Sequence, residues 1–339
     1  MTERIAYRLK AGSIKNLRAV SENLPAPAPE EVTVAVESIG LNFADVFAVW
    51  GLYSATPKGE FVPGLEYAGT ITAVGDDVSG VQVGDRVMGI TRFGAYATHL
   101  NIDARYVLPL PADWSFDEGA AYLVQVLTAY YALLKLGNLQ RGARVLIHSA
   151  AGGVGTLANR IAKKYDAHTI GSVGHADKIE YCRREGYDAT LVRDSDFAKN
   201  LDHTLDGAGI DLILECIGGK IFEIGYERLA PEGRSVVYGS ARYAQKADKP
   251  NYLKLLYQFV TRPKVDPQKM IELNRGVLGF NLIYLYERVE LMHELLSEIA
   301  ELDIEKPNVG RTFSWADLPD ALRAFRTGKT TGKVVVRIK

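Results

Sequence analysis

The sequence predicts an α/β protein in which a doubly wound parallel sheet is joined to a second, irregular β domain. Short apolar strands alternate with helices from residue 141 to about residue 240, which is typical of a parallel sheet covered on both faces. A glycine-rich turn follows the first of these strands and begins a helix. The first 120 or so residues instead contain short strands separated by Gly/Asp turns, which indicates a β-rich domain.

The β-rich part is followed by a helical segment. We expect strands at residues 32–36, 67–74 and 86–90, and a short helix at residues 42–49 with Asn42 near its start. Ser115 and Glu118 have the spacing of a capping box, so a helix begins there. It continues to Leu136 with a break near residues 123–126, and Gly137 ends it.

The alternating part predicts five strands and four helices, followed by a less regular insert at residues 241–275. The strands are expected at residues 145–147, 169–171, 189–192, 211–216 and 235–238, and the helices at 156–165, 178–185, 197–205 and 221–229. Further helices are expected at residues 252–260, 287–302 and 315–325, a strand with a loop at 278–284, and a last strand at 333–339. The terminal helix and strand should rejoin the β-rich part, giving one domain from residues 1–124 with 264–339 and another from residues 125–263.

The glycine-rich turn lies within Arg144–Gly155 and predicts a dinucleotide-binding site. Gly152 lets the backbone approach a pyrophosphate, and Gly155 lets the helix lie close to the strand. The unpaired N–H groups at the start of this helix would face the phosphates. The first glycine of the usual G-x-G-x-x-G pattern is replaced by Ala150.

The second strand of the alternating part favours NADPH over NADH. NAD-binding units carry an acidic residue at the end of this strand, and none is present here. Ser172, Lys178 and Arg193 are instead placed to bind a 2′-phosphate. Lys178 and Arg193 are also compatible with ordinary solvated charges, and Asp177 beside Lys178 weakens the argument.

Composition excludes several classes of protein. The 339 residues include 40 basic and 41 acidic side chains, so nothing indicates a nucleic-acid partner. The two cysteines, Cys182 and Cys216, do not form a C-x-x-C motif, which argues against a disulfide scaffold or a structural zinc site. The first residues are polar and no apolar run is expected to span a membrane, so a cytoplasmic location is the default expectation.

Several motifs occur together and in order along the whole chain. They resemble the zinc-independent quinone oxidoreductase branch of the medium-chain dehydrogenase/reductase superfamily, and residues 273–285 with the preceding insert are similar to the vesicle amine transport protein group. The motifs are Gly40–Asp45, Gly51–Tyr53, Pro63–Gly69, Val83–Val87, Leu127–Tyr130, Ala150–Gly155 and Thr331–Val334.

The resemblance implies a GroES-like catalytic domain, a Rossmann domain that binds NADP, and a homodimer formed through edge strands. It implies that Asn42 and Tyr53 flank the nicotinamide and the substrate, that Thr128 bonds the carboxamide, and that Phe280 and Leu282 pack along the nicotinamide. The other implied cofactor contacts are Ala151, Gly152, Gly153, Val154, Gly155, Gly239, Ser240 and Lys333.

A catalytic zinc is not expected. Zinc-dependent relatives carry a cysteine near residues 42–45 and a histidine where this chain has Leu65. A catalytic zinc needs three protein ligands, and these are missing. Glu66 is interpreted as a structural hydrogen-bond acceptor.

The chemistry left without a metal is hydride transfer to a quinone or to an alkene conjugated to a carbonyl group. Negative charge then develops on the carbonyl oxygen, and Tyr53 is the first candidate donor. Quinone reduction also proceeds without a fixed acid. The alternatives are that Tyr53 is a loop aromatic, Asn42 a helix cap and Phe280 a core residue. His148 lies within a strand and is expected to be a hydrogen-bonded core residue.

Two other functions remain open. An enoyl-thioester reductase would use the same hydride chemistry with a basic portal, for which Lys246, Lys249, Lys254 and Arg262 are candidates. A nucleotide-binding protein that associates with lipid would use the apolar segment 252–260, although such a segment more often covers a pocket or an interface.

Overall fold

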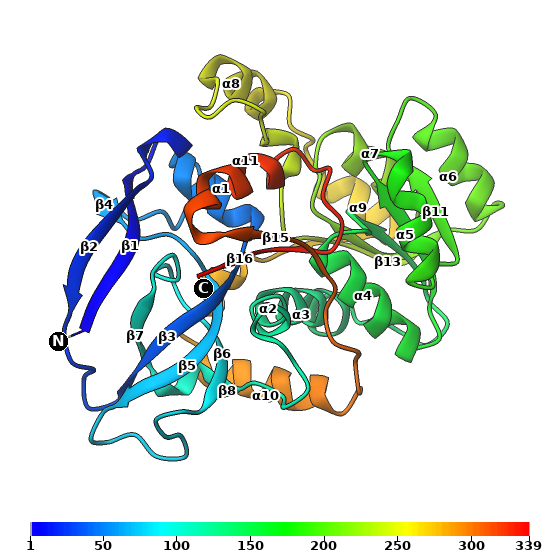
Figure 1. Cartoon of the computed structure of the whole chain (residues 1–339). Coiled ribbons are helices and arrows are strands. Elements are labelled where there is room, and N and C mark those ends of the chain that lie inside the picture. Colours follow the sequence, from blue (N-terminus) through cyan, green and yellow to red (C-terminus); the bar gives the residue numbers. More distant parts are fainter. Residues whose placement is uncertain (1, 339) are drawn as a thin grey trace.

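The computed structural model describes residues 2–338 and shows two lobes (Figure 1). The first lobe contains a mostly antiparallel seven-stranded sheet with the order β15-β16-β3-β5-β6-β8, in which β7 also pairs with β3, and a three-stranded sheet with the order β2-β1-β4. These strands are β1 Thr2–Lys10, β2 Arg18–Leu24, β3 Glu31–Gly40, β4 Glu60–Phe61, β5 Glu66–Val74, β6 Arg86–Ile90, β7 His99–Asp103, β8 Val107–Pro109, β15 Val309–Ser314 and β16 Lys333–Arg337.

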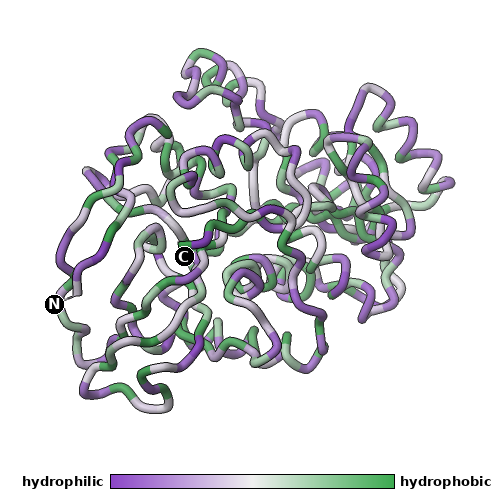
Figure 2. The backbone as a smooth tube through the Cα atoms, viewed as in Figure 1, coloured by the Kyte–Doolittle hydropathy of each residue, from purple (hydrophilic) through white to green (hydrophobic). Residues whose placement is uncertain are grey.

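The second lobe is built on a six-stranded sheet with the order β11-β10-β9-β12-β13-β14, and all its strand pairs are parallel. The doubly wound sheet predicted from the alternating pattern is thereby confirmed. Its strands are β9 Arg144–His148, β10 His168–Val173, β11 Ala189–Val192, β12 Ile210–Glu215, β13 Leu229–Val237 and β14 Gly276–Gly279. Figure 2 shows hydrophobic segments along these strands, inside their helical cover.

The helices fall on both faces of this sheet. One core contains Val145 and Ile147 and continues into the first lobe, whereas a separate core packs Leu146 and Ile213 against α6 and α7. The helices are α1 Phe43–Trp50, α2 Phe116–Gly119, α3 Leu123–Tyr130, α4 Gly153–Lys164, α5 Ile179–Arg184, α6 Phe197–Leu205, α7 Lys220–Tyr226, α8 Tyr252–Val260, α9 Pro267–Leu273, α10 Val289–Ala300 and α11 Leu318–Phe325.

The boundary between the lobes differs from the expected one. Residue 264 is too early for the chain to leave the second lobe, because β14 at Gly276–Gly279 pairs with β13. The chain returns to the first lobe only after this strand. There β16 pairs with β3, as expected for the terminal strand, whose last residue, Lys339, lies outside the described residues.

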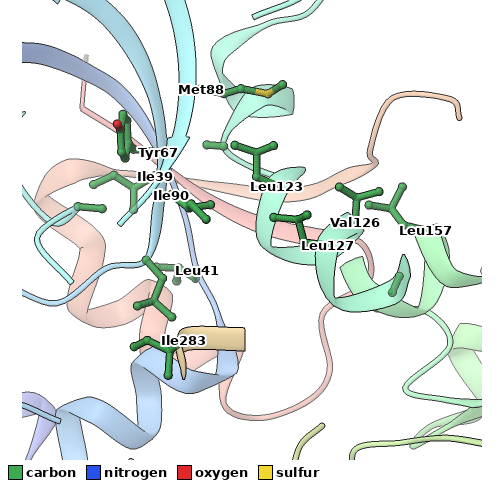
Figure 3. Close-up of a cluster of buried hydrophobic side chains, with 14 of the residues drawn as sticks. Ile39, Leu41, Tyr67, Met88, Ile90, Leu123, Val126, Leu127, Leu157 and Ile283 are labelled. Atoms are coloured by element: carbon green, nitrogen blue, oxygen red, sulfur yellow. The ribbon is translucent and has the colours of Figure 1, made fainter. Parts of the chain in front are cut away.

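The segment after Ser115 joins the two lobes. The Ser115–Glu118 capping box is confirmed, but the helix is interrupted between α2 and α3 rather than at residues 123–126, and it ends in a π-helix at Tyr131–Leu136. In Figure 3, Leu123 and Leu127 of α3 face residues of the first lobe such as Ile90 of β6. Val126 lies near Leu157 of α4. α3 therefore packs in the hydrophobic core shared by both lobes.

The same segment corrects the expectation that no stretch is apolar enough to cross a membrane. Within the described residues, Phe116–Leu136 meets that test by length and composition alone. Of the most apolar 18-residue stretch within this segment, 67% is buried inside the protein, which is typical of a core helix.

Candidate active site

A cavity of about 1090 Å³ lies between the two lobes. It begins at the glycine turn after β9, passes the ends of β10, β12 and β13, and reaches α1, α3 and β6 of the first lobe. The carboxyl ends of parallel strands are the usual place for ligands in such sheets. Every cofactor and catalytic residue expected from the sequence lines this cavity except Ser172.

The glycine turn has the geometry that a phosphate cradle needs. Gly152 precedes the first turn of α4 and no side chain caps this helix, so its first N–H groups are open toward the cavity. A Cβ on Gly155 would lie 2.6 Å from the carbonyl oxygen of Ser149, so only glycine allows α4 to approach the strand this closely. Ala151, Gly153 and Val154 also border the cavity.

Two cations, Lys178 and Arg193, line the cavity beside the end of β10. The Lys178 ammonium donates to the carbonyl oxygens of Gly328 (2.7 Å) and Thr330. The Arg193 guanidinium donates through Nη1 to the carbonyl oxygen (2.7 Å) and the hydroxyl (2.9 Å) of Ser172. Burial lowers the pKa of both cations.

The expectation that Ser172 contacts the phosphate is corrected. Its side chain points into the sheet, is fully buried, and lies 2.5 Å from Nδ1 of His148. Alternate residues of a strand face opposite sides, and Ser172 faces the interior. His148 is the buried, hydrogen-bonded histidine that the sequence predicted.

The opposite end of the cavity brings together the residues expected around the nicotinamide. Thr128 of α3 lines this part, and its hydroxyl donates to the carbonyl oxygen of Val124 at 2.6 Å. Gly239 and Ser240 border it after β13, and Phe280 and Leu282 border it after β14. The ring of Phe280 lies 6.3 Å from that of Tyr238, which also lines the cavity, so this wall is aromatic.

Asn42 and Lys333 belong to a buried polar cluster that also contains Glu66 and Gln125. Glu66 Oε1 accepts hydrogen bonds from the Lys333 ammonium, from Asn42 Nδ2 at 2.9 Å and from Gln125 Nε2 at 2.8 Å. The Lys333 ammonium also donates to Asn42 Oδ1 at 2.9 Å and to Gln125 Oε1 at 2.6 Å. Glu66 thus acts as a hydrogen-bond acceptor in the structure.

Burial acts against both charges of this cluster. It raises the pKa of Glu66 and lowers the pKa of Lys333, while each charge opposes the shift of its partner. The ion pair is therefore held by mutual attraction and by the amides of Asn42 and Gln125. Lys333 also adjoins the glycine turn, because the backbone N–H of Gly332 donates to the carbonyl oxygen of Ala151 at 2.8 Å.

Asn42 is also the N-cap of α1. Its backbone N–H donates to Asp45 Oδ2 at 2.7 Å, while its side-chain amide is turned toward Glu66 and Lys333. The capping role and the position on the cavity wall therefore coexist.

Tyr53 follows α1 and reaches the cavity from the first lobe. Its hydroxyl donates to Asn281 Oδ1 at 2.7 Å, which connects it to the segment that carries Phe280 and Leu282. Burial raises its pKa to about 12. The phenol therefore stays protonated at neutral pH, as a proton donor must.

Beyond Tyr53 the cavity continues into an apolar arm. Its wall is formed by side chains of the first-lobe sheet and its loops, of α3, of α10 and of the segment after β14, namely Leu65, Ile90, Leu127, Ile283, Met292 and Leu295. Thr91 also borders this arm, but its hydroxyl donates to the carbonyl oxygen of Phe93 at 2.6 Å. The arm is therefore suited to an apolar group.

Sequence reasoning missed Gln125 and Asn281 as members of the site. Asn281 stands directly between Phe280 and Leu282, so its position was a usable signal. Gln125 lies in an apolar helical run, where a lone amide among hydrophobic residues was the only signal. No three His, Cys, Asp or Glu side chains come together as a metal site in residues 2–338.

The fold and the cavity define a two-lobed, nucleotide-binding enzyme class, and comparisons with known proteins agree. Residues 28–112 match the family model described as the alcohol dehydrogenase GroES-like domain, and residues 153–297 match the one described as zinc-binding dehydrogenase. The synaptic vesicle membrane protein VAT-1 homolog of Rattus norvegicus is 32% identical over 316 residues, which cover 92% of this chain and 78% of that protein. The chain belongs to the medium-chain dehydrogenase/reductase superfamily of oxidoreductases.

Solved structures confirm the predicted pairing of a Rossmann domain with a GroES-like domain. The Escherichia coli quinone oxidoreductase complexed with NADPH has a TM-score of 0.85 and 26% identity, with 99% of this chain and 100% of that chain covered. The CurK enoyl reductase has a TM-score of 0.84 and 28% identity, with both chains fully covered.

Proposed function

We propose that this protein is an NADPH-dependent, zinc-independent reductase of quinones or α,β-unsaturated carbonyl compounds. The observation that carries the proposal is the continuous cavity, which joins a glycine turn and two cations at one end to Tyr53, Thr128 and an apolar arm at the other. The relative from E. coli, which is named as a quinone oxidoreductase and was solved with NADPH, shares the whole fold.

The residues of the cavity fit a dinucleotide. The open N-terminus of α4 would hold the pyrophosphate, Lys178 and Arg193 the 2′-phosphate, and Thr128 with Phe280 and Leu282 the nicotinamide. A bound NADPH supplies a hydride. The Lys333–Glu66 cluster keeps Asn42 and Gln125 in fixed orientations beside this end of the cavity.

The substrate would lie between Tyr53 and the apolar arm. Its carbonyl oxygen becomes more negative as hydride arrives, and a hydrogen bond from the Tyr53 hydroxyl stabilises that charge. In the structure the Tyr53 hydroxyl donates to Asn281 Oδ1, and it would turn from this partner to the substrate oxygen. The apolar arm accepts the rest of the substrate and excludes water from the reacting carbon.

The first experiment is a fluorescence titration of the purified protein with NADPH and with NADH, followed by a screen of quinones and enones as oxidants. We expect saturable binding of NADPH, much weaker binding of NADH, and oxidation of bound NADPH by at least one compound class. Equal or preferred binding of NADH would remove the 2′-phosphate assignment. Binding of neither nucleotide would exclude the reductase.

An enoyl-thioester reductase is the nearest enzymatic alternative, and the similarity to the CurK enoyl reductase supports it. Lys246 borders the cavity mouth, where it could meet the phosphates of a carrier arm. Crotonyl-CoA and crotonaldehyde share the reacting double bond and differ in the carrier. A kcat/KM at least tenfold higher for the thioester would favour this alternative.

The exposed surface of α8 favours a second candidate function, association with an anionic lipid surface. None of its residues is buried, and Leu253 and Tyr257 are 81% and 70% exposed. The helix projects away from the body of the molecule (Figure 1), and Lys254 and Arg262 supply positive charge on or beside it. A basic, apolar helix of this kind can lie on an anionic membrane.

Co-sedimentation with phosphatidylserine vesicles at low and high salt tests this candidate. Binding at low salt that is lost in Leu253→Asp would support it. Ile5→Asp is the matched control, because Ile5 is an exposed apolar residue (42%) in the first lobe. Absence of binding at low salt would exclude lipid association.

A homodimer formed through the cofactor lobes is the proposed assembly. β14 is an end strand of the six-stranded sheet, so its outer edge is available to a second copy. Light scattering coupled to size-exclusion chromatography should give twice the mass of 37.2 kDa. A monomeric mass over the working concentration range would contradict the dimer.

A further inference from the structure

A chain of buried polar groups runs through the second lobe from Arg193 to Glu215. Arg193 Nη1 donates to the Ser172 hydroxyl, and Ser172 Oγ lies 2.5 Å from His148 Nδ1. On the other side of the imidazole ring, Nε2 lies 3.3 Å from Glu215 Oε2, outside regular hydrogen-bond geometry, and neither atom has another partner among the described residues. His148, Ser172 and Glu215 are each at most 1% exposed and lie on the adjacent strands β9, β10 and β12.

One order of donors gives every group in this chain a partner. Arg193 donates to Ser172 Oγ, and the hydroxyl proton of Ser172 is directed to His148 Nδ1. The neutral imidazole then carries its own proton on Nε2, which points at Glu215. The opposite tautomer would set the Nε2 lone pair against a carboxylate oxygen. Burial lowers the pKa of His148 well below its usual value, which keeps the ring neutral.

Both ends of the chain reach the cavity wall. Arg193 lines the cavity beside Gly174, and its Nη2 would lie 3.4 Å from a Cβ placed there. Nη2 makes no hydrogen bond within the described part of the chain. At the other end, Glu215 Oε1 accepts the backbone N–H groups of Ile217 and Gly218, and Ile217 also lines the cavity.

We propose that Ser172, oriented by His148 and Glu215, is a positioning residue that holds the Arg193 guanidinium so that its open edge faces the 2′-phosphate of NADPH. The inference rests on the proposed binding of NADPH. Ser172 then determines the preference for a 2′-phosphorylated nucleotide without touching it. Hydrogen bonds that involve a charged group are the stronger ones. The Arg193 guanidinium donates to the backbone carbonyl and to the hydroxyl of Ser172, and only the hydroxyl bond depends on the side chain.

The test uses binding of 2′,5′-ADP and 5′-AMP, which differ only in the 2′-phosphate, so no turnover is needed. We expect Ser172→Ala to weaken 2′,5′-ADP binding about tenfold and to leave 5′-AMP binding unchanged. Ser172→Thr keeps the hydroxyl and should restore the preference. The matched control is Ser235→Ala in β13, because Ser235 is equally buried and its hydroxyl has no hydrogen-bond partner among the described residues.

The outcomes separate this inference from the proposed function. Wild-type protein that binds NADPH tightly, together with a Ser172→Ala variant that keeps the full preference for 2′,5′-ADP, would overturn only the positioning role. Equal weakening of 2′,5′-ADP and 5′-AMP binding would also overturn it, because the effect would be structural. If the alanine variant does not fold, Ser172→Cys gives the same comparison, since a thiol forms only weak hydrogen bonds.

Nitrogen NMR of the imidazole provides an independent readout. The expected signature is a neutral His148 ring with the proton on Nε2, unchanged from about pH 5 to about pH 8. A ring protonated on Nδ1 would contradict this donor order and the part that His148 plays in orienting the Ser172 hydroxyl. Wild-type protein that binds neither nucleotide would remove both the proposed function and this inference.

Discussion

At the scale of single residues, the ion pair of Lys333 and Glu66 holds the polar side of the active site together. Both side chains are almost completely buried, so removing one charge leaves the other without compensation in a poorly polar environment. The cost is then set by desolvation rather than by the lost attraction alone. This is why we expect single substitutions here to be more damaging than the double substitution.

Lys333→Met is expected to lower the free energy of unfolding by about 3–5 kcal/mol, measured by urea denaturation. Lys333→Met combined with Glu66→Gln should recover much of this loss, because the uncompensated carboxylate is gone. The exposed pair of Arg18 and Glu60 is the control, and Arg18→Met should cost less than about 1 kcal/mol. A double variant no more stable than Lys333→Met would contradict the explanation.

Tyr53 provides the second prediction at this scale. Tyr53→Phe removes the proposed donor and should lower kcat by about 10²- to 10⁴-fold while NADPH binding is retained. Because the pKa of Tyr53 is raised to about 12, the phenol is still protonated as the pH rises through the neutral range, and the rate should show no loss assignable to it below about pH 10.

The control for Tyr53 is Tyr122→Phe. Burial raises the pKa of Tyr122 to about 12 as well, but this side chain packs against Trp114 and does not line the cavity. Its kcat should match that of the wild type. Full activity of Tyr53→Phe toward quinones would show that reduction proceeds without a fixed acid.

At the scale of secondary-structure elements, the start of α4 is the feature most specific to phosphate binding. Gly152→Ala adds a Cβ 3.2 Å from the carbonyl oxygen of Ser149, so the turn must shift by a few tenths of an ångström, and it places a methyl group on the cavity wall. We expect NADPH binding to weaken at least tenfold, with only a small decrease in the melting temperature of the protein without nucleotide. Gly276→Ala in β14, where a Cβ would make only ordinary contacts of 3.6 Å or more, should alter neither.

The cap of α1 makes the stability of the protein depend on pH. Burial raises the pKa of Asp45 from 3.8 to about 7, and the backbone N–H of Asn42 and the nearby Lys333 ammonium offset only part of this shift. The folded state therefore binds more protons than the unfolded state between about pH 4 and pH 7. Stability from this group is present at low pH and is lost as the pH rises through this window.

Asp45→Asn removes this dependence and keeps an oxygen that can accept the N–H of Asn42. The difference in unfolding free energy between variant and wild type should grow from about pH 4 to about pH 7 by an amount on the order of 4 kcal/mol and then stay constant. Urea denaturation at several pH values measures it. A difference that does not vary with pH would mean that Asp45 titrates near its ordinary value.

The elements themselves could largely be predicted from the sequence, because their signals are local. The strand–turn–helix around Gly152 and the capping box at Ser115 depend on residues a few positions apart. The polar cluster could not be predicted in this way. Its members are brought together only by the topology of the two lobes, and they are Asn42, Glu66, Gln125 and Lys333. The prediction that Ser172 contacts the 2′-phosphate failed for a related reason. A shift of one residue along a strand moves a side chain from one face of the sheet to the other.

At the scale of the whole molecule, the two lobes are expected to unfold as one unit. Lys333 of β16 is bonded to Gln125 at the start of α3, and Gly332 is bonded to Ala151 in the glycine turn. α3 also packs in the core shared by both lobes. A ligand held by the turn should therefore stabilise the first lobe as well as the second.

The three tryptophans make this coupling measurable, because Trp50, Trp114 and Trp315 all lie in the part of the chain outside the six-stranded sheet and its helices. At about one hundred times its Kd, NADPH should add about 2.7 kcal/mol to the unfolding free energy. The same gain should be seen by tryptophan fluorescence, which reports the first lobe, and by amide exchange of β9 and β10. In Lys333→Met the link is weakened, so the fluorescence transition should respond less to NADPH than the exchange of β9 does. Wild-type fluorescence that is insensitive to bound NADPH would show instead that the lobes unfold independently.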